Sequence, residues 1–350
     1  MTLKEIKLEP LLDTLTLTKI SDEVYFSSEY SNYVSNSRLG KINPNQGGSA
    51  KLFFAPFVGG DYSPALELGS AVHELVLQPE YFELAENLGK PTAKLGAMAD
   101  TLYPIFIGKD ITPEDVIEAS NKVDYYKGKM TSDLIKKVIT SCTPYWKARS
   151  ESELNIDLGK ELIHLDYKTM EITKSCVQAL TNNTQVQQLL HPEGLLEEPI
   201  VANEQAILLD VKATCPNGKE FILHLKSKLD NYTIDKETNT IIVNDVKTIG
   251  KILSEFNNNI SRYHYSREMA MYLFLLKLCA EKFYDVKNPK IQANYLVVST
   301  IPDFYTKVQP VTYGEIVQGF KEFQTLLRYV AYQIGYHNYT LDERSNKYQF

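Results

Sequence analysis

The spacing of apolar residues predicts helices in the first half of the chain and strands in the second half. The segment "PALELGSAVHELVL" at 64–77 places Leu68, Val72 and Leu75 at helical spacing, and Pro79 ends the pattern. From about residue 200 the pattern changes to apolar runs separated by turn residues, which predicts strands. These strands are expected at 204–214, 220–234, 239–249 and 290–301.

Capping signals place further helices around these strands. Thr112-Pro113 with Asp115 predicts a helix start in a helical region at 112–150, and Thr312 with Glu315 predicts the start of the last helix. The segment 266–284 is apolar almost all round, so this helix should be buried. The sequence therefore predicts an α/β fold in which helices flank a central sheet, with a helical insertion at about 110–190. Residues 1–60 are expected to form loops and short helices that pack on a domain of residues 61–350.

Charge is distributed unevenly along the chain. The 350 residues carry a net charge of -7, which argues against a protein held to nucleic acid by its total charge. From Lys122 to Arg149, however, the chain has seven basic residues and only two acidic ones. The same segment contains Tyr125, Tyr126, Tyr145 and Trp146. Cations interleaved with aromatic rings are typical of a nucleic-acid contact, and a solvated helix face is the alternative. The candidate DNA-binding residues are Lys127, Lys129, Lys136, Lys137, Lys147 and Arg149.

The remaining composition favours a cytoplasmic protein. No run approaches the roughly 18 apolar residues of a membrane span, and the first residues lack the apolar core of a secretion signal. Four scattered cysteines without a Cys-x-x-Cys pair are expected to be reduced thiols, with a metal cluster as the alternative.

A predicted hairpin at 228–248, "KLDNYTIDKETNTIIVNDVKT", carries the candidate chemistry. If its turn is centred on 236–239, Asp230 lies opposite Asp245, and Lys247 points to the same face. Two carboxylates so close repel each other, and a hard divalent cation such as Mg²⁺ between them removes that penalty. Lys247 could then orient or deprotonate a bound water and stabilise charge on a phosphate. Ordinary solvent-facing strand residues are the alternative.

These residues resemble the PD-(D/E)xK nuclease superfamily, with Leu229 in place of the proline. Three further segments agree in order. "LGSAVHELVLQPEYF" at 68–82 resembles the Gly-x-x-x-His helix of the RecB-like branch. "YSNYVSNSRL" at 30–39 resembles the N-terminal segment of phage RecE-type enzymes, and "SREMAMY" at 266–272 resembles the Gln-x-x-x-Tyr helix, with Glu268 in place of Gln. The nearest group is the RecE or exodeoxyribonuclease VIII type, which implies a restriction-endonuclease-like core.

The resemblance implies specific roles for the matching residues. Asp230, Asp245 and the backbone carbonyl of Val246 would bind metal, with His73 on or near it and Lys247 as the catalytic lysine. Glu204 is a looser candidate for a further metal ligand. Glu268 and Tyr272 would support the site or contact the substrate backbone. An ionised glutamate only accepts hydrogen bonds and repels phosphate, so Glu268 should pair with Arg267 or Lys247, or face the metal.

The function expected from the resemblance is a Mg²⁺-dependent exonuclease, with Mn²⁺ able to substitute. It would digest linear double-stranded DNA from 5′ ends and leave 3′ single strands for a single-strand annealing protein in phage or prophage recombination. A ring-shaped homo-oligomer is expected as well. A structure-specific endonuclease of the same fold, or an inactive DNA-binding or assembly protein, are the alternatives.

Overall fold

The chain forms two compact units, each described here by itself. The computed structural model describes residues 3–55, 63–86, 89–156, 159–337 and 339–341. The first unit comprises Met1–Ser63 and Gln178–Phe350, and the second comprises Pro64–Val177. The boundary predicted between residues 60 and 61 lies outside the described residues.

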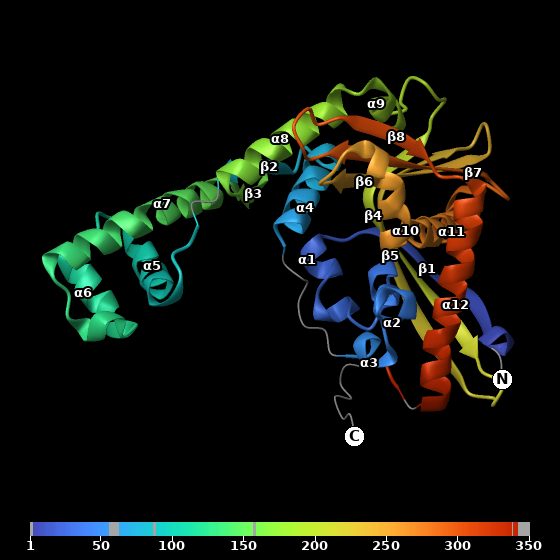
Figure 1. Cartoon of the computed structure of the whole chain (residues 1–350), viewed down its shortest axis with the longest axis horizontal. Helices are drawn as coiled ribbons and strands as arrows, with labels where there is room; N and C mark the ends of the chain where they lie inside the picture. Colours follow the sequence, from blue (N-terminus) through green and yellow to red (C-terminus); the bar gives the residue numbers. More distant parts are fainter. Residues whose placement is uncertain (1–2, 56–62, 87–88, 157–158, 338, 342–350) are drawn as a thin grey trace. The chain divides into compact units, whose positions relative to one another are not determined.

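A six-stranded mixed sheet forms the centre of the first unit (Figure 1). Neighbouring strands are antiparallel except for β6 and β7, which are parallel and are joined through the helices α10 and α11. Such a parallel pair needs a crossover connection of this kind. The mixed α/β fold predicted from the sequence is confirmed. In spatial order the strands are β1 (Lys7–Lys19), β4 (Ile200–Thr214), β5 (Glu220–Asp235), β6 (Thr240–Ile249), β7 (Lys290–Ser299) and β8 (Thr306–Pro310).

The four strands predicted from residue 200 onward are confirmed, but the sequence analysis did not predict β1 and β8. Both are the outermost strands of the sheet, where one row of backbone groups needs no partner. Pro10 within β1 cannot donate a hydrogen bond, and this is tolerated at a sheet edge. The segment expected to hold only loops and short helices therefore also contributes an edge strand.

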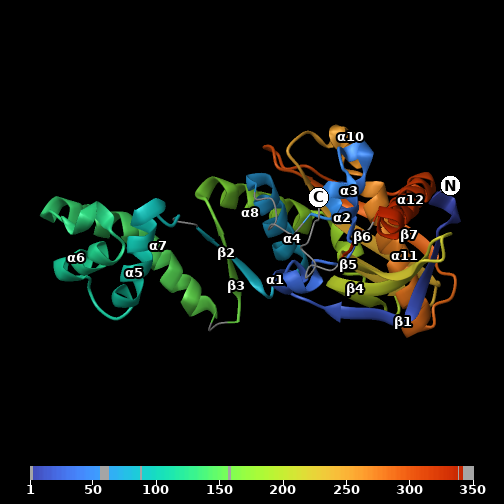
Figure 2. The same cartoon turned by 90° about the horizontal axis from the view of Figure 1, so that it is seen from below.

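Two long helices pack on the sheet of the first unit. They are α11 (Tyr265–Tyr284) and α12 (Tyr313–His337), and they lie side by side (Figures 1 and 2). α11 buries residues all round, as its apolar sequence predicts. The predicted capping box at Thr312 and Glu315 opens α12. At Gly319 of α12 a Cβ atom would lie 1.9 Å from the carbonyl oxygen of Ser266, so the two helices cross where only glycine fits.

Short elements complete the first unit. They are η1 (Leu3–Glu5), α1 (Asp22–Tyr25), η2 (Ser28–Tyr30), α2 (Asn36–Ile42), η3 (Pro44–Gln46), α3 (Ala50–Phe53), α9 (Thr184–Leu190), η5 (Leu253–Glu255) and α10 (Phe256–Tyr263).

The second unit is mainly helical (Figure 2). Its helix α4 spans Pro64–Leu77, as the sequence predicts, and the predicted capping box at Thr112 opens another helix. A parallel pair of short strands also belongs to this unit, so the region expected to be a helical insertion contains a strand as well. The other elements are β2 (Phe82–Glu86), α5 (Ala93–Phe106), α6 (Pro113–Lys122), η4 (Tyr125–Gly128), α7 (Ser132–Ile156), β3 (Glu161–Leu165) and α8 (Tyr167–Asn182), within which the boundary between the units falls.

The helices α5, α6 and α7 share a core that includes Trp146. This tryptophan is fully buried, and its indole N–H donates a hydrogen bond to the Ala99 carbonyl oxygen at 2.8 Å. The interpretation of Trp146 as a stacking platform for bases is therefore wrong, because its ring stabilises the unit instead. In the described part of the chain, no helix combines the length and the apolar character needed to span a membrane.

Candidate functional site

The register of the β5–β6 hairpin agrees with the prediction. The paired residues run from Asp235 opposite Thr240 to Asn231 opposite Asn244, so the turn occupies 236–239. Asp230 and Asp245 are the next residues in this register, one on each strand. Their carboxylates therefore come from neighbouring positions, as the hairpin pattern indicated.

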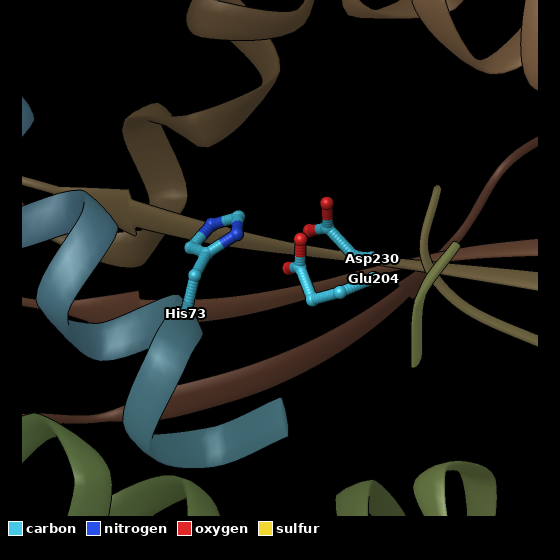
Figure 3. Close-up of side chains that lie close together, drawn as sticks. All are labelled: His73, Glu204 and Asp230. Carbon is cyan, nitrogen blue, oxygen red and sulfur yellow. The ribbon is translucent and has the colours of Figure 1, made fainter. Parts of the chain in front are cut away.

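Glu204 extends this arrangement onto β4. Asn203 pairs with Asn231 and Gln205 pairs with Leu229, which places Glu204 opposite Asp230. A carboxylate oxygen of Glu204 lies within 4.8 Å of one of Asp230, and Figure 3 shows the two side chains turned the same way. Three adjacent strands thus carry acids at one level of the sheet. We call Glu204, Asp230 and Asp245 the carboxylate row.

The backbone pairing of β5 with its neighbours β4 and β6 is interrupted at the carboxylate row. Glu204 has a φ of 51°, a left-handed conformation that costs a residue other than glycine about 1–3 kcal/mol. On the other side, the Val246 N–H donates to Oδ2 of Asp230 at 2.8 Å instead of to a strand carbonyl. Such departures persist only where the surrounding structure holds them in place, and they concentrate at functional sites.

An asparagine ladder lies directly beside the carboxylate row. Asn294 donates to Asn244 at 2.9 Å, Asn244 to Asn231 at 2.8 Å, and Asn231 to Asn203 at 2.7 Å, each from Nδ2 to Oδ1. Successive strand residues point to opposite faces, so the ladder occupies the face opposite the acids. Asn244 also donates to the Leu189 carbonyl oxygen of α9 on that side. The ladder connects β4, β5, β6 and β7 one residue away from the carboxylate row.

The acids of the hairpin are deeply buried. Asp245 is 1% exposed and Asp230 is 8% exposed. Burial raises the pKa of both carboxyls, although the Lys247 ammonium opposes this effect. Lys247 Nζ lies 2.8 Å from Oδ2 and 2.9 Å from Oδ1 of Asp245. Burial alone would lower the pKa of Lys247, but Asp245, Glu268 and Asp230 raise it well above its ordinary value. Lys247 is therefore held as a cation.

Glu268 of α11 pairs with Lys247, at 3.2 Å between Oε2 and Nζ. The Tyr272 hydroxyl, one turn later, lies 3.3 Å from Oε1 of Glu268 and can donate to it. Arg267, the other partner considered for Glu268, is buried and occupied by Glu322 at 3.0 Å and by Asn36 at 2.7 Å. Of the two cationic partners considered for Glu268, Lys247 is therefore the one that it contacts.

A second lysine that the sequence analysis missed contacts the carboxylate row. Lys228 Nζ lies 2.8 Å from Oε2 of Glu204 and also pairs with Asp22 of α1. Burial lowers the pKa of Lys228, but Glu204 and Asp22 outweigh it, so this pKa is raised overall. Lys228 and Asp230 are two residues apart on β5 and share a face. That spacing was available in the sequence as a signal.

The donor set of the row fits a hard divalent cation. Oδ2 of Asp245 is buried and accepts no hydrogen bond from the described residues, although the Lys247 ammonium lies close to it. Carboxylates whose pKa is raised by burial gain stability as anions when a cation is bound between them. Oxygen ligands of this kind suit Mg²⁺ or Mn²⁺.

The structure places the other predicted site residues as follows. Val246 is buried beside the row. His73 lies on α4 of the second unit and is labelled in Figure 3, and its role as a metal ligand stays a prediction. All six candidate DNA-binding residues also belong to the second unit, and five of them are exposed: Lys127, Lys129, Lys136, Lys137 and Lys147.

Arg149 is the exception among these six residues. Its guanidinium stacks over the Tyr103 ring at 4.0 Å and pairs with Glu153 at 3.2 Å and with Asp100 at 3.7 Å. The carboxylates already neutralise much of its charge, so the exposed lysines are better placed to contact a phosphate.

Comparisons with known proteins add little to this picture. No protein-family model matches the sequence, and no curated protein sequence matches it. Among solved structures, the chain is similar to a protein from Eubacterium rectale provisionally described as an exonuclease, with 10% identity and a TM-score of 0.45. The similarity covers 89% of this chain and 85% of that chain. A TM-score this low supports no argument about activity.

Proposed function

We propose that this protein is a metal-dependent nuclease whose centre is the carboxylate row with Lys247. The observation that carries the proposal is the register, which brings acids from three strands to one level and sets a buried lysine against Asp245. Acids and an ammonium in one buried cluster are a costly arrangement unless they serve a site. A divalent cation held there would supply Lewis-acid stabilisation of charge on a phosphate.

Each residue has a role in this proposal. Glu204, Asp230, Asp245 and the Val246 carbonyl would hold the cation, and His73 would complete the ligand set, as the sequence resemblance implies. Lys247 is held as a cation between two carboxylates, so it would stabilise negative charge on a phosphate rather than accept a proton. Glu268 and Tyr272 would fix the position of that lysine.

The substrate expected from the resemblance is linear double-stranded DNA, digested as an exonuclease from the 5′ end. We further propose that the exposed lysines of the second unit hold the DNA backbone, because each phosphate they neutralise releases counterions and strengthens binding. A homo-oligomeric ring, a single-strand annealing partner and a role in phage recombination belong to the same proposal.

End-labelled DNA tests the proposal. Linear duplexes labelled at the 5′ or the 3′ end would be incubated with and without Mg²⁺, with the wild type, with Lys247→Ala, and with Lys236→Ala as a control. Lys236 is an exposed lysine in the turn of the same hairpin. We expect Mg²⁺-dependent release of mononucleotides from the 5′ label, lost in Lys247→Ala and kept in Lys236→Ala.

Other outcomes would change the proposal in defined ways. Internal cuts would identify an endonuclease with the same centre. Binding of DNA without cleavage under any metal condition would identify an inactive DNA-binding protein and overturn the nuclease proposal.

A further inference from the structure

A group of aromatic side chains lies directly beside Lys247. The Tyr265 ring centroid is 4.9 Å from Lys247 Nζ. The same ring stacks on Phe256 at 6.0 Å and lies 6.0 Å from Tyr295, and both of these neighbours are buried. Tyr265 is therefore fixed by the core on one side and contacts the catalytic lysine of the proposed centre on the other.

Tyr263 extends this group of aromatic side chains toward solvent. Its ring centroid is 5.7 Å from that of Tyr265, with 30° between the ring planes, and the residue is 48% exposed. The exposed Arg262 places its guanidinium 5.6 Å from the Tyr263 ring centroid. A half-exposed aromatic face and an adjacent cation together offer a surface for a planar ring and for a phosphate.

The backbone that presents Tyr263 is well anchored. His264, the next residue, ends α10 in a left-handed conformation with a φ of 56° and joins it to α11. Its Nδ1 lies 2.7 Å from Oε1 of Glu322, and the same oxygen lies 3.0 Å from Arg267. This anchored backbone limits the conformational entropy that is lost when a ligand stacks on the Tyr263 ring.

We propose that Tyr263 is a base-stacking site for an unpaired nucleotide that lies within a few positions of the phosphate at the carboxylate row. Arg262 would contact the backbone of the same strand. The inference rests on the proposed nuclease function and specifies that the strand is bound single-stranded and without sequence preference, because every base has an aromatic face. It concerns only residues of the first unit.

Binding of labelled single-stranded DNA tests this site. A fluorescein-labelled oligothymidylate and an abasic oligonucleotide of the same length would be titrated in Ca²⁺ against the wild type, Tyr263→Ala and Tyr263→Phe. Tyr305→Ala is the matched control, because Tyr305 is a tyrosine of 66% exposure in the β7–β8 connection. Stacking of one base on an aromatic ring corresponds to a loss of roughly five- to 150-fold in affinity when the ring is removed.

We expect Tyr263→Ala to lose this affinity for oligothymidylate only, while Tyr263→Phe and Tyr305→Ala bind as the wild type does. Arg262→Ala should reduce the dependence of log affinity on log salt by about 0.7 on both oligonucleotides. An equal loss on the abasic strand, or no loss relative to Tyr305→Ala, would overturn the stacking site while leaving the nuclease proposal standing. A wild type that binds neither oligonucleotide would overturn the stacking site, and the end-label assay decides the nuclease proposal separately.

Discussion

The asparagine ladder gives the most quantitative prediction about this fold. Asn231 sits at its centre, is fully buried, donates to Asn203 and accepts from Asn244. Replacement by leucine, which has a similar shape, removes both hydrogen bonds and leaves an amide group on each neighbour without this partner. Each buried polar group left unsatisfied costs about 1–3 kcal/mol.

The loss of the Asn231 amide affects its two neighbours, Asn203 and Asn244, to different extents. Asn244 keeps its hydrogen bond to the Leu189 carbonyl oxygen at 3.2 Å, and Asn203 is only partly buried. We therefore expect Asn231→Leu to lower the free energy of unfolding by about 2–4 kcal/mol, in the lower part of the range for two lost partners. Urea unfolding followed by circular dichroism would measure this difference.

Thr233→Val is the matched control for that measurement. Thr233 lies two residues further along β5 on the same face and is equally buried, but its hydroxyl has no hydrogen-bond partner among the described residues. Its replacement by valine should be neutral or stabilising.

A local measurement reports on the carboxylate row itself. Hydrogen exchange at the Val246 N–H, which donates to Asp230, should become faster in Asn231→Leu, because the ladder holds β5 and β6 together beside the repelling acids. If Asn231→Leu were no less stable than Thr233→Val and exchange at Val246 were unchanged, the ladder would have no role in holding the row.

Two other predictions concern charge. Charge reversal in Lys136→Glu/Lys137→Glu should weaken DNA binding and reduce the dependence of log affinity on log salt by about two. Lys287→Glu, at an exposed lysine of the first unit, is the control and should have neither effect. An unchanged salt dependence in the double variant would exclude Lys136 and Lys137 from the DNA interface. Burial, and then the Arg38 cation, lower the pKa of Lys226 from 10.5 to about 8. Between these pH values the unfolded chain binds more protons than the folded chain, so Lys226 makes the free energy of unfolding rise with pH from about 8 to 10.5. Lys226→Met should remove that rise in urea titrations across this pH interval, and a variant with the slope of the wild type would contradict the assigned environment.

Much of the sheet could be predicted because its turns fix the register. The turn at 236–239 set Asp230 opposite Asp245, and the Pro-Asn-Gly turn at 216–218 fixes the β4–β5 register in the same way. The pair Thr214 and Glu220 closes that turn, and the same register places Glu204 opposite Asp230. Applied in the same way as the turn at 236–239, this second turn would make Glu204 a firm candidate for the site rather than a loose one.

Long-range packing could not be predicted in this way. The sequence leaves open whether Glu268 pairs with Arg267, with Lys247 or with a metal, because the choice depends on how α11 packs in the fold. The close approach of α12 to α11 at Gly319 and the contacts of Arg267 help to fix that packing. Edge strand β1 has weak alternation, and its partner β4 lies almost 200 residues away in the chain. The burial of Trp146 likewise depends on α5, which the basic and aromatic composition of 122–149 does not indicate.

The order of residues in β4, β5 and β6 shows that the carboxylate row and the asparagine ladder depend on the same strand register. β4 reads Asn203-Glu204, β5 reads Asp230-Asn231, and β6 reads Asn244-Asp245. The order reverses on β5 because that strand runs antiparallel to both neighbours, so the acids share one face and the amides share the other. A slip of one residue in any strand would move an acid to the amide face and an amide to the acid face. The hydrogen bonds of the asparagine ladder therefore oppose the same register slip that would separate the carboxylates. This role explains why buried asparagines occupy positions that apolar residues would otherwise fill.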